Sequence, residues 1–231
     1  MTLTLYTNPM SRGRIARWML EEVGEEYDTV ILDYETTMKA EPYLSINPMA
    51  KVPAIVHNHK TVTECAAICA YLAEAFPAAE LAPRDEERAD YYRWLFFAAG
   101  PIEAAVTNRS LGVVPSEAQQ RMVGYGDYDR VVDVLEQAVA AHDFIAGDRF
   151  TAADVYVGSQ VMFGQQFGSL PKRGAFEDYV ARLTAREGYR RAAALDDAVA
   201  LFDLDAAALD EPAAFDRPLT LDPADALAPP K

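Results

Sequence analysis

The segment Asn47-Pro48-Met49-Ala50-Lys51-Val52-Pro53-Ala54-Ile55 places a proline at the start of an apolar run with high β-propensity. Because proline has no N–H group, a sheet accepts it only at a strand start, an edge or a bulge. Glu64-Cys65-Ala66-Ala67-Ile68 comes soon after and follows Thr63, a residue type that favours the N-cap of a helix. A helix start can hold a carboxylate because it carries free N–H groups and a positive dipole end. Together the two segments predict a binding site for a short, charged peptide.

The residues around these segments predict an alternation of strands and helices. Residues 2–6 alternate like a strand, and Pro9 and Ser11 lead into a helix that Gly24 ends. Further elements follow in this order: a strand at 27–32, a short helix or turn at 36–46, a strand at 52–57, a turn at 58–59, a strand at 60–63 and a helix at 63–76. The strand–helix–strand opening implies parallel pairing, and the closing hairpin adds an antiparallel strand. This order is typical of a thioredoxin-like α/β domain, which we assign to residues 1–79.

The second half of the chain has almost no strand signals beyond a linker at residues 83–85. Apolar residues at helical spacing predict helices at 86–109 with a bend at 100–101, and at 152–166, 175–186 and 189–209. A further helix is predicted at 117–142, provided that it tolerates Gly124 and Gly126. We therefore predict that an all-α helical bundle domain, at residues 86–209, follows the α/β domain. Residues 210–231 are rich in proline and acids and are expected to be extended or disordered.

Charge and composition restrict the possible partners. A formal net charge of −15 argues against nucleic acid and against an anionic membrane surface, because both attract clustered Lys and Arg. The two cysteines, Cys65 and Cys69, are too few for a disulfide framework and indicate a reducing compartment. The sequence has no apolar run of membrane-spanning length and its start is unlike a signal peptide, so we expect a cytoplasmic protein. The scattered histidines make no metal pattern, so no metal is expected.

Three motifs carry a resemblance to a known family. They are Asn47-Pro48-x-x-Lys51-Val52-Pro53, Glu64-Cys65-x-Ala67-Ile68-x-x-Tyr71-Leu72 and Phe150-Thr151-Ala152-Ala153-Asp154. In this order, on a two-domain plan, they resemble the glutathione transferases over most of the chain, with cysteine at position 65 where serine is usual. We interpret Thr151 and Asp154 in the third motif as a capping box with a structural role.

The resemblance implies a site for glutathione, a co-substrate with two carboxylates, an amine and a thiol. Val52 would pair backbone to backbone with the cysteinyl unit, beside a cis Val52–Pro53 bond. Lys51 would hold one carboxylate, the N–H of Cys65 would hold the γ-glutamyl carboxylate, and Glu64 would take the amine. Because a thiol is a weaker donor than a hydroxyl, the Cys65 side chain can lose its bond to glutathione while the backbone bond remains.

Activation of the glutathione thiol needs a donor. Lowering the pKa of a cysteine thiol from about 8.5 to about 7 takes about 2 kcal/mol, which one hydrogen bond to a charged acceptor can supply. The candidate donors lie at the entry to the first helix: Ser11 is the first choice, Arg12 is the next, and Asn8 and Tyr6 are the others within reach. This loop contains no cysteine, which argues against a mixed disulfide there and weakens a glutaredoxin-like interpretation.

The resemblance therefore implies a glutathione transferase, a detoxifying enzyme that adds the thiol to a small hydrophobic electrophile held between the domains. Two alternatives stay open: a glutathione-dependent disulfide reductase or peroxidase, and a non-catalytic binding protein. Apolar residues that could line the electrophile's pocket, although most residues of this kind are core, are Tyr91, Trp94, Phe97, Met162, Phe163 and Phe167. Because family members usually form two-fold dimers, we expect a homodimer.

Overall fold

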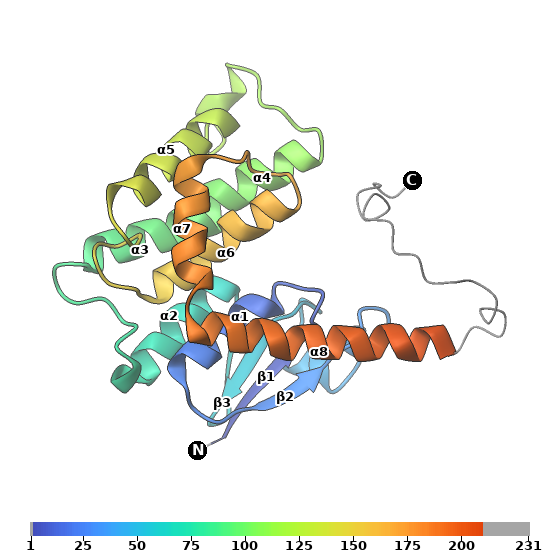
Figure 1. Cartoon of the computed structure of the whole chain (residues 1–231). Helices are drawn as coiled ribbons and strands as arrows, with labels where there is room; N and C mark the ends of the chain where they lie inside the picture. Colours follow the sequence, from blue (N-terminus) through green and yellow to red (C-terminus); the bar gives the residue numbers. More distant parts are fainter. Residues whose placement is uncertain (1, 210–231) are drawn as a thin grey trace, which may run out of the picture.

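The computed structural model describes the backbone of residues 2–209 and the side chains of residues 2–200, so the tail predicted at 210–231 lies outside the described residues. The first part of the chain forms a sheet in the order β2-β1-β3-β4 (Figure 1). Its strands are β1 (Leu3–Thr7), β2 (Asp28–Ile31), β3 (Ala54–His57) and β4 (Lys60–Thr63). β1 pairs parallel with β2, whereas the β1–β3 and β3–β4 pairs are antiparallel. The predicted thioredoxin-like α/β arrangement is confirmed.

Two helices, α1 (Gly13–Val23) and α2 (Cys65–Ala75), pack against this sheet. Leu5 and Ile55 of the sheet are fully buried in one core with residues of both helices. Burying a side chain of this size stabilises the fold by about 1.5–3 kcal/mol. α1 ends at Gly24, which has a φ of 79° as expected of a left-handed C-cap.

The opposite side of the sheet holds a second, smaller cluster. It consists of Leu32, Met38, Tyr43 and Ala54, with Tyr6, Ile46 and Val52 packed against it. Two short 3-10 helices, Thr37–Lys39 and Tyr43–Ser45, form the stretch for which short helices or turns are predicted. Because side chains alternate along β1, Tyr6 points away from the core that contains Leu5, and its ring lies 5.7 Å from the ring of Tyr43.

The second part of the chain is helical, as predicted. It contains α3 (Arg88–Phe97), α4 (Glu103–Ser110), α5 (Tyr128–Ala141), α6 (Ala152–Gln166), α7 (Gly174–Thr184) and α8 (Glu187–Leu209). A π-helical turn, Ala98–Ile102, contains Pro101 and separates α3 from α4. It confirms the predicted bend, since a π-bulge and a proline are both recognised causes of a kink.

One predicted helix boundary is wrong. The sequence predicts a helix at 117–142, but α5 begins only at Tyr128. Gly126 adopts a φ of 70°, which lies outside helical backbone geometry. Asp127 then caps α5, because its side chain accepts a hydrogen bond from the N–H of Arg130 at 2.9 Å.

The predicted capping box at the start of α6 is confirmed. The N–H of Thr151 donates to Oδ2 of Asp154 at 2.9 Å, and the Thr151 side chain in turn accepts the backbone N–H of Asp154. The N–H of Ile145 and the hydroxyl of Tyr179 donate to Oδ1 at 2.7 and 2.8 Å. Burial raises the pKa of Asp154 to about 6, although these hydrogen bonds lower it. Asp154 therefore joins α6 to α7 and to the loop before α6.

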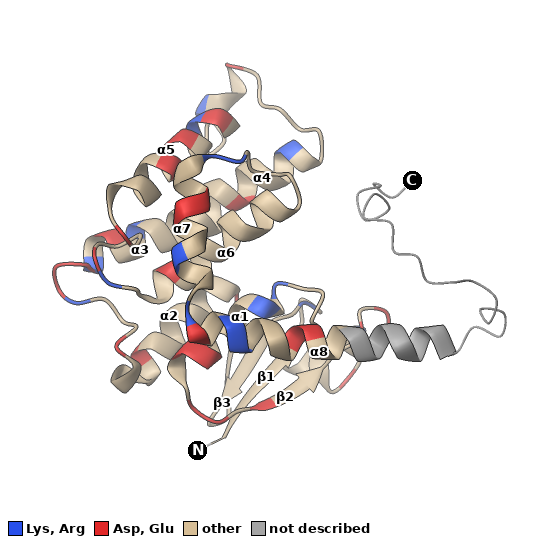
Figure 2. Cartoon of the chain, in the orientation of Figure 1, with Lys and Arg blue, Asp and Glu red and all other residues tan. Residues whose placement is uncertain are grey.

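The last described helix, α8, returns to the first part of the chain and lies along α1 (Figure 1). Nε of Arg17 on α1 lies 2.7 Å from Oδ1 of Asp196 on α8, and both side chains are buried. Arg186, just before α8, lies 2.8 Å from Glu22. Figure 2 shows basic positions of α1 close to acidic positions of α8. Breaking a buried pair is strongly destabilising, so these contacts hold the helical part against the sheet part.

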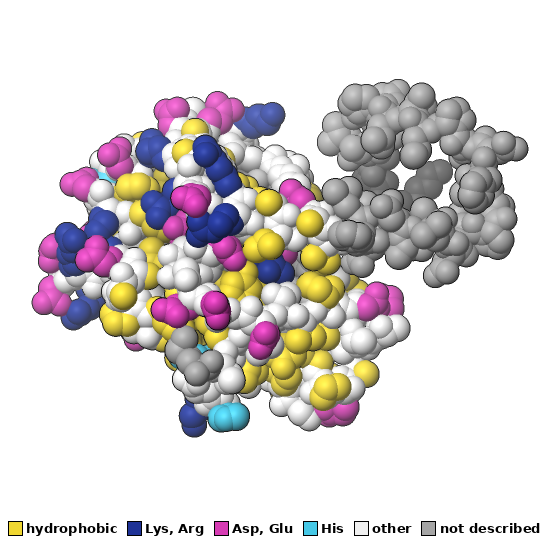
Figure 3. Space-filling view, turned by 60° about the horizontal axis from the view of Figure 1, so that its bottom comes forward, with side chains coloured by type: hydrophobic (Ala, Val, Ile, Leu, Met, Phe, Trp, Pro, Cys, Tyr) yellow, Lys and Arg dark blue, Asp and Glu magenta, His cyan; other side chains and the backbone are white. Residues whose placement is uncertain are grey.

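The surface has mixed charge. On the face shown in Figure 3, Lys and Arg side chains lie among Asp and Glu and alternate with hydrophobic patches. None of the helices in the described part is long and apolar enough to cross a membrane.

Candidate functional site

Three segments meet at one end of the sheet. In the strand register Tyr6 faces Ala54, and Ala54 faces Thr63. The carboxyl ends of β1 and β4 and the start of β3 therefore lie side by side. Continuing the same register brings Asn8, Val52 and the start of α2 to this edge. α1 and α2 both begin just beyond it.

Val52 presents an unpaired backbone at this edge. The Val52–Pro53 bond is cis, which confirms the expectation drawn from the resemblance. Across the described residues the N–H and C=O of Val52 take part in no hydrogen bond. The preceding carbonyl, that of Lys51, accepts hydrogen bonds from the Tyr43 hydroxyl and from Nδ2 of Asn47. The loop is thus held from behind while Val52 stays free for a ligand.

The Lys51 side chain is exposed, and within the described residues it forms no ion pair. The sequence suggested Thr63 as the N-cap of α2, but the N-cap is Glu64. Glu64 is exposed, has a φ of 67° and makes no side-chain cap. Its carbonyl accepts the N–H of Ile68, the first bond of the helix. The carboxylate of Glu64 and the ammonium of Lys51 are therefore both available to a ligand at the same edge.

Cys65 begins α2 and contacts the start of α1. Its Sγ lies 3.7 Å from the backbone oxygen of Arg12, in a weak hydrogen bond. Burial raises the pKa of Cys65 to about 12, and the positive charge of Arg12 only partly opposes this. The side chain is therefore a neutral thiol at pH 7, and the backbone N–H of the first turn is the stronger donor for an anion here.

The loop between β1 and α1 is tied by its own polar side chains. Nδ2 of Asn8 donates to the carbonyl of Leu32 at 2.9 Å, and its Oδ1 accepts the N–H of Met10 at 2.8 Å. The Ser11 hydroxyl donates to the carbonyl of Asn8 at 2.6 Å and accepts the N–H of Gly13 at 2.8 Å. Asn8 thus fastens the loop to the end of β2, and Ser11 ties the loop to Gly13, the first residue of α1.

Gly13 is required for the close approach of this loop to the sheet. A Cβ atom at Gly13 would lie 1.8 Å from Oγ1 of Thr7 and 2.9 Å from Oγ of Ser11. Thr7 is fully buried on β1. The glycine therefore lets the first turn of α1 rest directly on the end of β1, which sets the position of Ser11.

A cleft of about 740 Å³ opens beside this loop, between α1, α4, α6 and α8. Ser11 and Arg12 lie on its wall, together with Glu103 of α4. Other residues that line it are Met10, Trp18, Tyr34, Val106, Gln160, Met162, Phe163, Phe167, Tyr189 and Asp196. The cleft combines an apolar wall with a few polar groups, which is typical of sites for small molecules.

Sequence reasoning identified only part of this cleft. Of the six predicted wall residues, Met162, Phe163 and Phe167 line it, whereas Tyr91 and Trp94 are buried in the core and Phe97 packs against that core. Glu103 and Gln160 were missed because nothing in the spacing of α4 or α6 distinguishes a cleft-facing polar residue from a solvated one. In the described part of the chain, no group of His, Cys, Asp and Glu is arranged to hold a metal ion.

Known proteins resemble about two thirds or more of the chain in sequence. The family model for the glutathione S-transferase N-terminal domain matches residues 1–74. The chain is 28% identical to glutathione S-transferase psoE of Aspergillus fumigatus, a match that covers 71% of this chain and 70% of that protein. It is 29% identical to disulfide-bond oxidoreductase YghU of Escherichia coli, over 67% of this chain and 58% of that protein.

Solved structures share the arrangement of both parts. The glutathione transferase URE2P6 from Phanerochaete chrysosporium, solved in complex with oxidized glutathione, has a TM-score of 0.68 and 26% identity, covering 86% of this chain and 97% of that one. A glutathione transferase from Methylococcus capsulatus has a TM-score of 0.70 and 24% identity, covering 85% of this chain and 99% of that one; at this identity the likeness concerns the fold.

Proposed function

We propose that the chain, which is similar to glutathione transferases in sequence and fold, binds glutathione at the sheet edge and activates its thiol for attack on a small electrophile. In this proposal Val52, before Pro53, pairs with the cysteinyl unit of glutathione. Lys51 and the backbone N–H of Cys65 take the two carboxylates, and Glu64 takes the amine. The electrophile occupies the cleft of about 740 Å³.

One observation carries the proposal: the unpaired backbone of Val52 lies at the same sheet edge as the start of α2. An extended peptide adds to an unpaired backbone edge through main-chain hydrogen bonds. A helix start a short distance away attracts a carboxylate through its free N–H groups and its dipole. A short peptide with a terminal carboxylate satisfies both, and glutathione is such a peptide.

The donor to the glutathione sulfur is expected from the loop between β1 and α1. Ser11 remains the first choice, and it would exchange its present bond to the Asn8 carbonyl for a bond to the thiolate, a charged acceptor. Arg12 is the second choice, because a positive charge within about 4–6 Å favours the ionised form of a thiol. Asn8 and Tyr6 are less suited, since Asn8 is engaged with β2 and the ring of Tyr6 packs on Tyr43.

The test measures glutathione binding by calorimetry and the pKa of the bound thiol by thiolate absorbance. We expect Ser11→Ala to raise that pKa by about 1–2 units and to lower kcat about tenfold or more. Arg88→Ala, which removes an exposed arginine of α3, is the matched surface control and should change neither quantity. Absence of glutathione binding at millimolar concentration by a folded protein would refute the proposed function.

A second candidate is glutathione-dependent disulfide reduction, which the similarity to the oxidoreductase YghU favours. The same site would then deliver the glutathione thiolate to a disulfide instead of to carbon. Parallel assays with a mixed disulfide and with a carbon electrophile separate the two reactions. Faster turnover of the mixed disulfide would favour reduction, and binding without turnover of either would favour a non-catalytic binding protein.

The family resemblance also leads us to propose a homodimer. Phe96 on α3 and Met49 in the loop before Pro53 are 71% and 69% exposed, and such large apolar side chains are the kind that a subunit interface buries. Sedimentation equilibrium of the full chain measures the assembly state. A monomer at micromolar concentration would contradict this proposal.

A further inference from the structure

The loop that carries Ser11 is connected to the last described helix through one side chain, that of Arg14. Nε of Arg14 donates a hydrogen bond to the carbonyl of Pro9 at 2.6 Å. Nη2 of the same guanidinium lies 2.8 Å from Oδ1 of Asp197 on α8. Arg14 therefore joins α8 to the backbone of the loop, two residues before Ser11.

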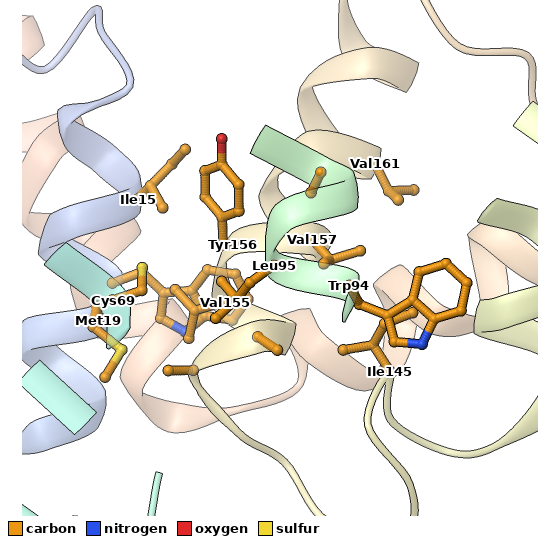
Figure 4. Packing of buried hydrophobic residues seen from close by; sticks show 14 of the residues in the cluster. Ile15, Met19, Cys69, Trp94, Leu95, Ile145, Val155, Tyr156, Val157 and Val161 are labelled. Atoms are coloured by element: carbon orange, nitrogen blue, oxygen red, sulfur yellow. The ribbon is translucent and has the colours of Figure 1, made fainter. Parts of the chain in front are cut away.

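Arg14 stands on a rigid support. It lies in the first turn of α1, next to Ile15. Ile15 and Met19, one helical turn apart, belong to the same buried cluster as Cys69 of α2 and Tyr156 of α6 (Figure 4). Because such a core is closely packed, α1 cannot shift without repacking it. The Arg14 side chain, by contrast, is 29% exposed and lines the cleft, so it can respond to a change in its partners.

The loop keeps its shape when the Ser11 hydroxyl changes partner. The carbonyl of Asn8 accepts the backbone N–H of Ser11 at 3.1 Å in addition to the hydroxyl. The hydroxyl can therefore turn to a thiolate by rotation about one side-chain bond, and the Asn8 carbonyl stays paired. The Pro9 carbonyl has no such second donor among the described residues, so the bond from Arg14 is the one that holds it.

We propose that Arg14, held by Asp197, is a positioning residue that fixes the Pro9 backbone and thereby aims the Ser11 hydroxyl at the sulfur of bound glutathione. This inference rests on the proposed function and adds a role for α8 to it. A donor that is already in place when the ligand arrives stabilises the thiolate without the cost of ordering a loop. Arg14 does not contact the sulfur in this proposal, so its whole effect passes through Ser11.

The test measures the pKa of bound glutathione by thiolate absorbance, and kcat with 1-chloro-2,4-dinitrobenzene as the electrophile. Arg14→Gln should raise this pKa by about 0.5–1 unit and lower kcat about three- to tenfold, because a misaligned hydrogen bond to a charged acceptor loses part of its strength. Asp197→Asn should raise the pKa by a smaller amount, since Arg14 keeps its bond to Pro9 and loses only its charged partner. In a Ser11→Ala background, Arg14→Gln should cause no further rise, because the donor through which Arg14 acts is gone.

The matched control is Arg191→Gln. Nε of Arg191 on α8 lies 3.0 Å from Oε2 of Glu21, near the other end of α1, so this variant removes an ion pair between the same two helices away from the loop. It should leave the thiol pKa and kcat as in wild type, whatever it does to stability in urea. An equal rise in the thiol pKa for Arg191→Gln and Arg14→Gln would overturn the inference, because the docking of α8 and not the Pro9 contact would then be responsible.

A fall in the thiol pKa of Asp197→Asn would also overturn the inference, because it would mean that the freed charge of Arg14 acts directly on the sulfur. Additive rises in the Ser11→Ala, Arg14→Gln double variant, or no rise in Ser11→Ala alone, would exclude an effect through Ser11. A wild-type pKa in Arg14→Gln with glutathione bound would refute this inference and leave the proposed function intact. A folded wild-type protein that binds no glutathione would refute the proposed function itself, and the inference with it.

Discussion

Nη2 of Arg12 lies 2.7 Å from Oε1 of Glu103, so an ion pair joins the entry of α1 to the first turn of α4. The two side chains are 55% and 30% exposed, and a pair in such a position contributes only about 0–1 kcal/mol to folding. Its location matters more than its strength. Arg12 lines the cleft, and its backbone oxygen contacts the Sγ of Cys65 at the start of α2. We therefore expect the ion pair with Glu103 to set how strongly the positive charge of Arg12 acts on the proposed thiolate.

Glu103→Gln should lower the pKa of bound glutathione, because it releases the Arg12 guanidinium from its partner and keeps the size of the side chain. Arg12→Ala should raise that pKa, since it removes the positive charge altogether. Thiolate absorbance as a function of pH, with glutathione saturating, measures both. If the two variants shift the pKa in the same direction, the charge of Arg12 does not act on the sulfur.

Cys65→Ser should strengthen glutathione binding about two- to tenfold, because a hydroxyl is a better donor than a neutral thiol whose pKa is raised to about 12. Calorimetric titration with glutathione gives the dissociation constant. Cys69→Ala is the control. It removes the other thiol, which lies one turn further along α2 and is fully buried. An unchanged or weaker affinity in the Cys65→Ser variant would show that the side chain at this position faces away from glutathione.

Gly13→Ala should destabilise the protein by about 1–3 kcal/mol, because the added Cβ would lie 1.8 Å from Oγ1 of Thr7. Urea unfolding measures the change. A second substitution, Thr7→Ala, should recover part of the loss by removing the clashing oxygen. Gly174→Ala serves as control, because a Cβ there meets nothing within 4 Å and α7 begins at that residue. Equal unfolding midpoints for Gly13→Ala and wild type would contradict the close approach.

Asp154 should make stability depend on pH between about 4 and 6. Its pKa is raised from 3.8 to about 6 by burial, so the folded state holds this proton more tightly than the unfolded state does. Stability is therefore highest while Asp154 is protonated and falls as the pH rises through this interval, by about 3 kcal/mol in total.

The check compares urea unfolding of wild type and Asp154→Asn from pH 4 to pH 7. The variant cannot ionise at this position, so the stability of wild type relative to the variant should decline as the pH rises. Asp148→Asn, at a carboxylate that is 93% exposed, provides the control slope. Parallel stability profiles for wild type and Asp154→Asn would mean that the Asp154 carboxyl titrates alike in the folded and unfolded states.

The sequence predicts those features that local patterns determine. Alternation over β1, the helical stripe of α1 and the Thr151–Asp154 capping box all depend on residues close together in the chain, and the structure contains each of them. α5 begins later than predicted because the left-handed backbone of Gly126 cannot belong to a right-handed helix, so the helix can start only after it. The choice of Glu64 as N-cap of α2 likewise depends on a backbone angle that residue type does not specify.

Some features of the candidate site could be predicted from the sequence, and others depend on contacts between distant residues. The cis bond before Pro53 followed from a family motif, and no rule of spacing alone would predict it. The ion pair between Arg12 and Glu103 joins residues far apart in the chain, and the cleft that Gln160 lines is formed by residues from distant helices. They depend on how the helical part docks on the sheet, which a single sequence does not encode in any local pattern.

The return of α8 onto α1 has a mechanical consequence. A chain whose last described helix is fastened to its first helix by the buried Arg17–Asp196 pair resists hinge motion between its halves. The cleft is therefore preformed, and ligand binding does not require the two parts of the chain to close on each other. Little of a ligand's binding free energy is then lost in ordering the protein around it.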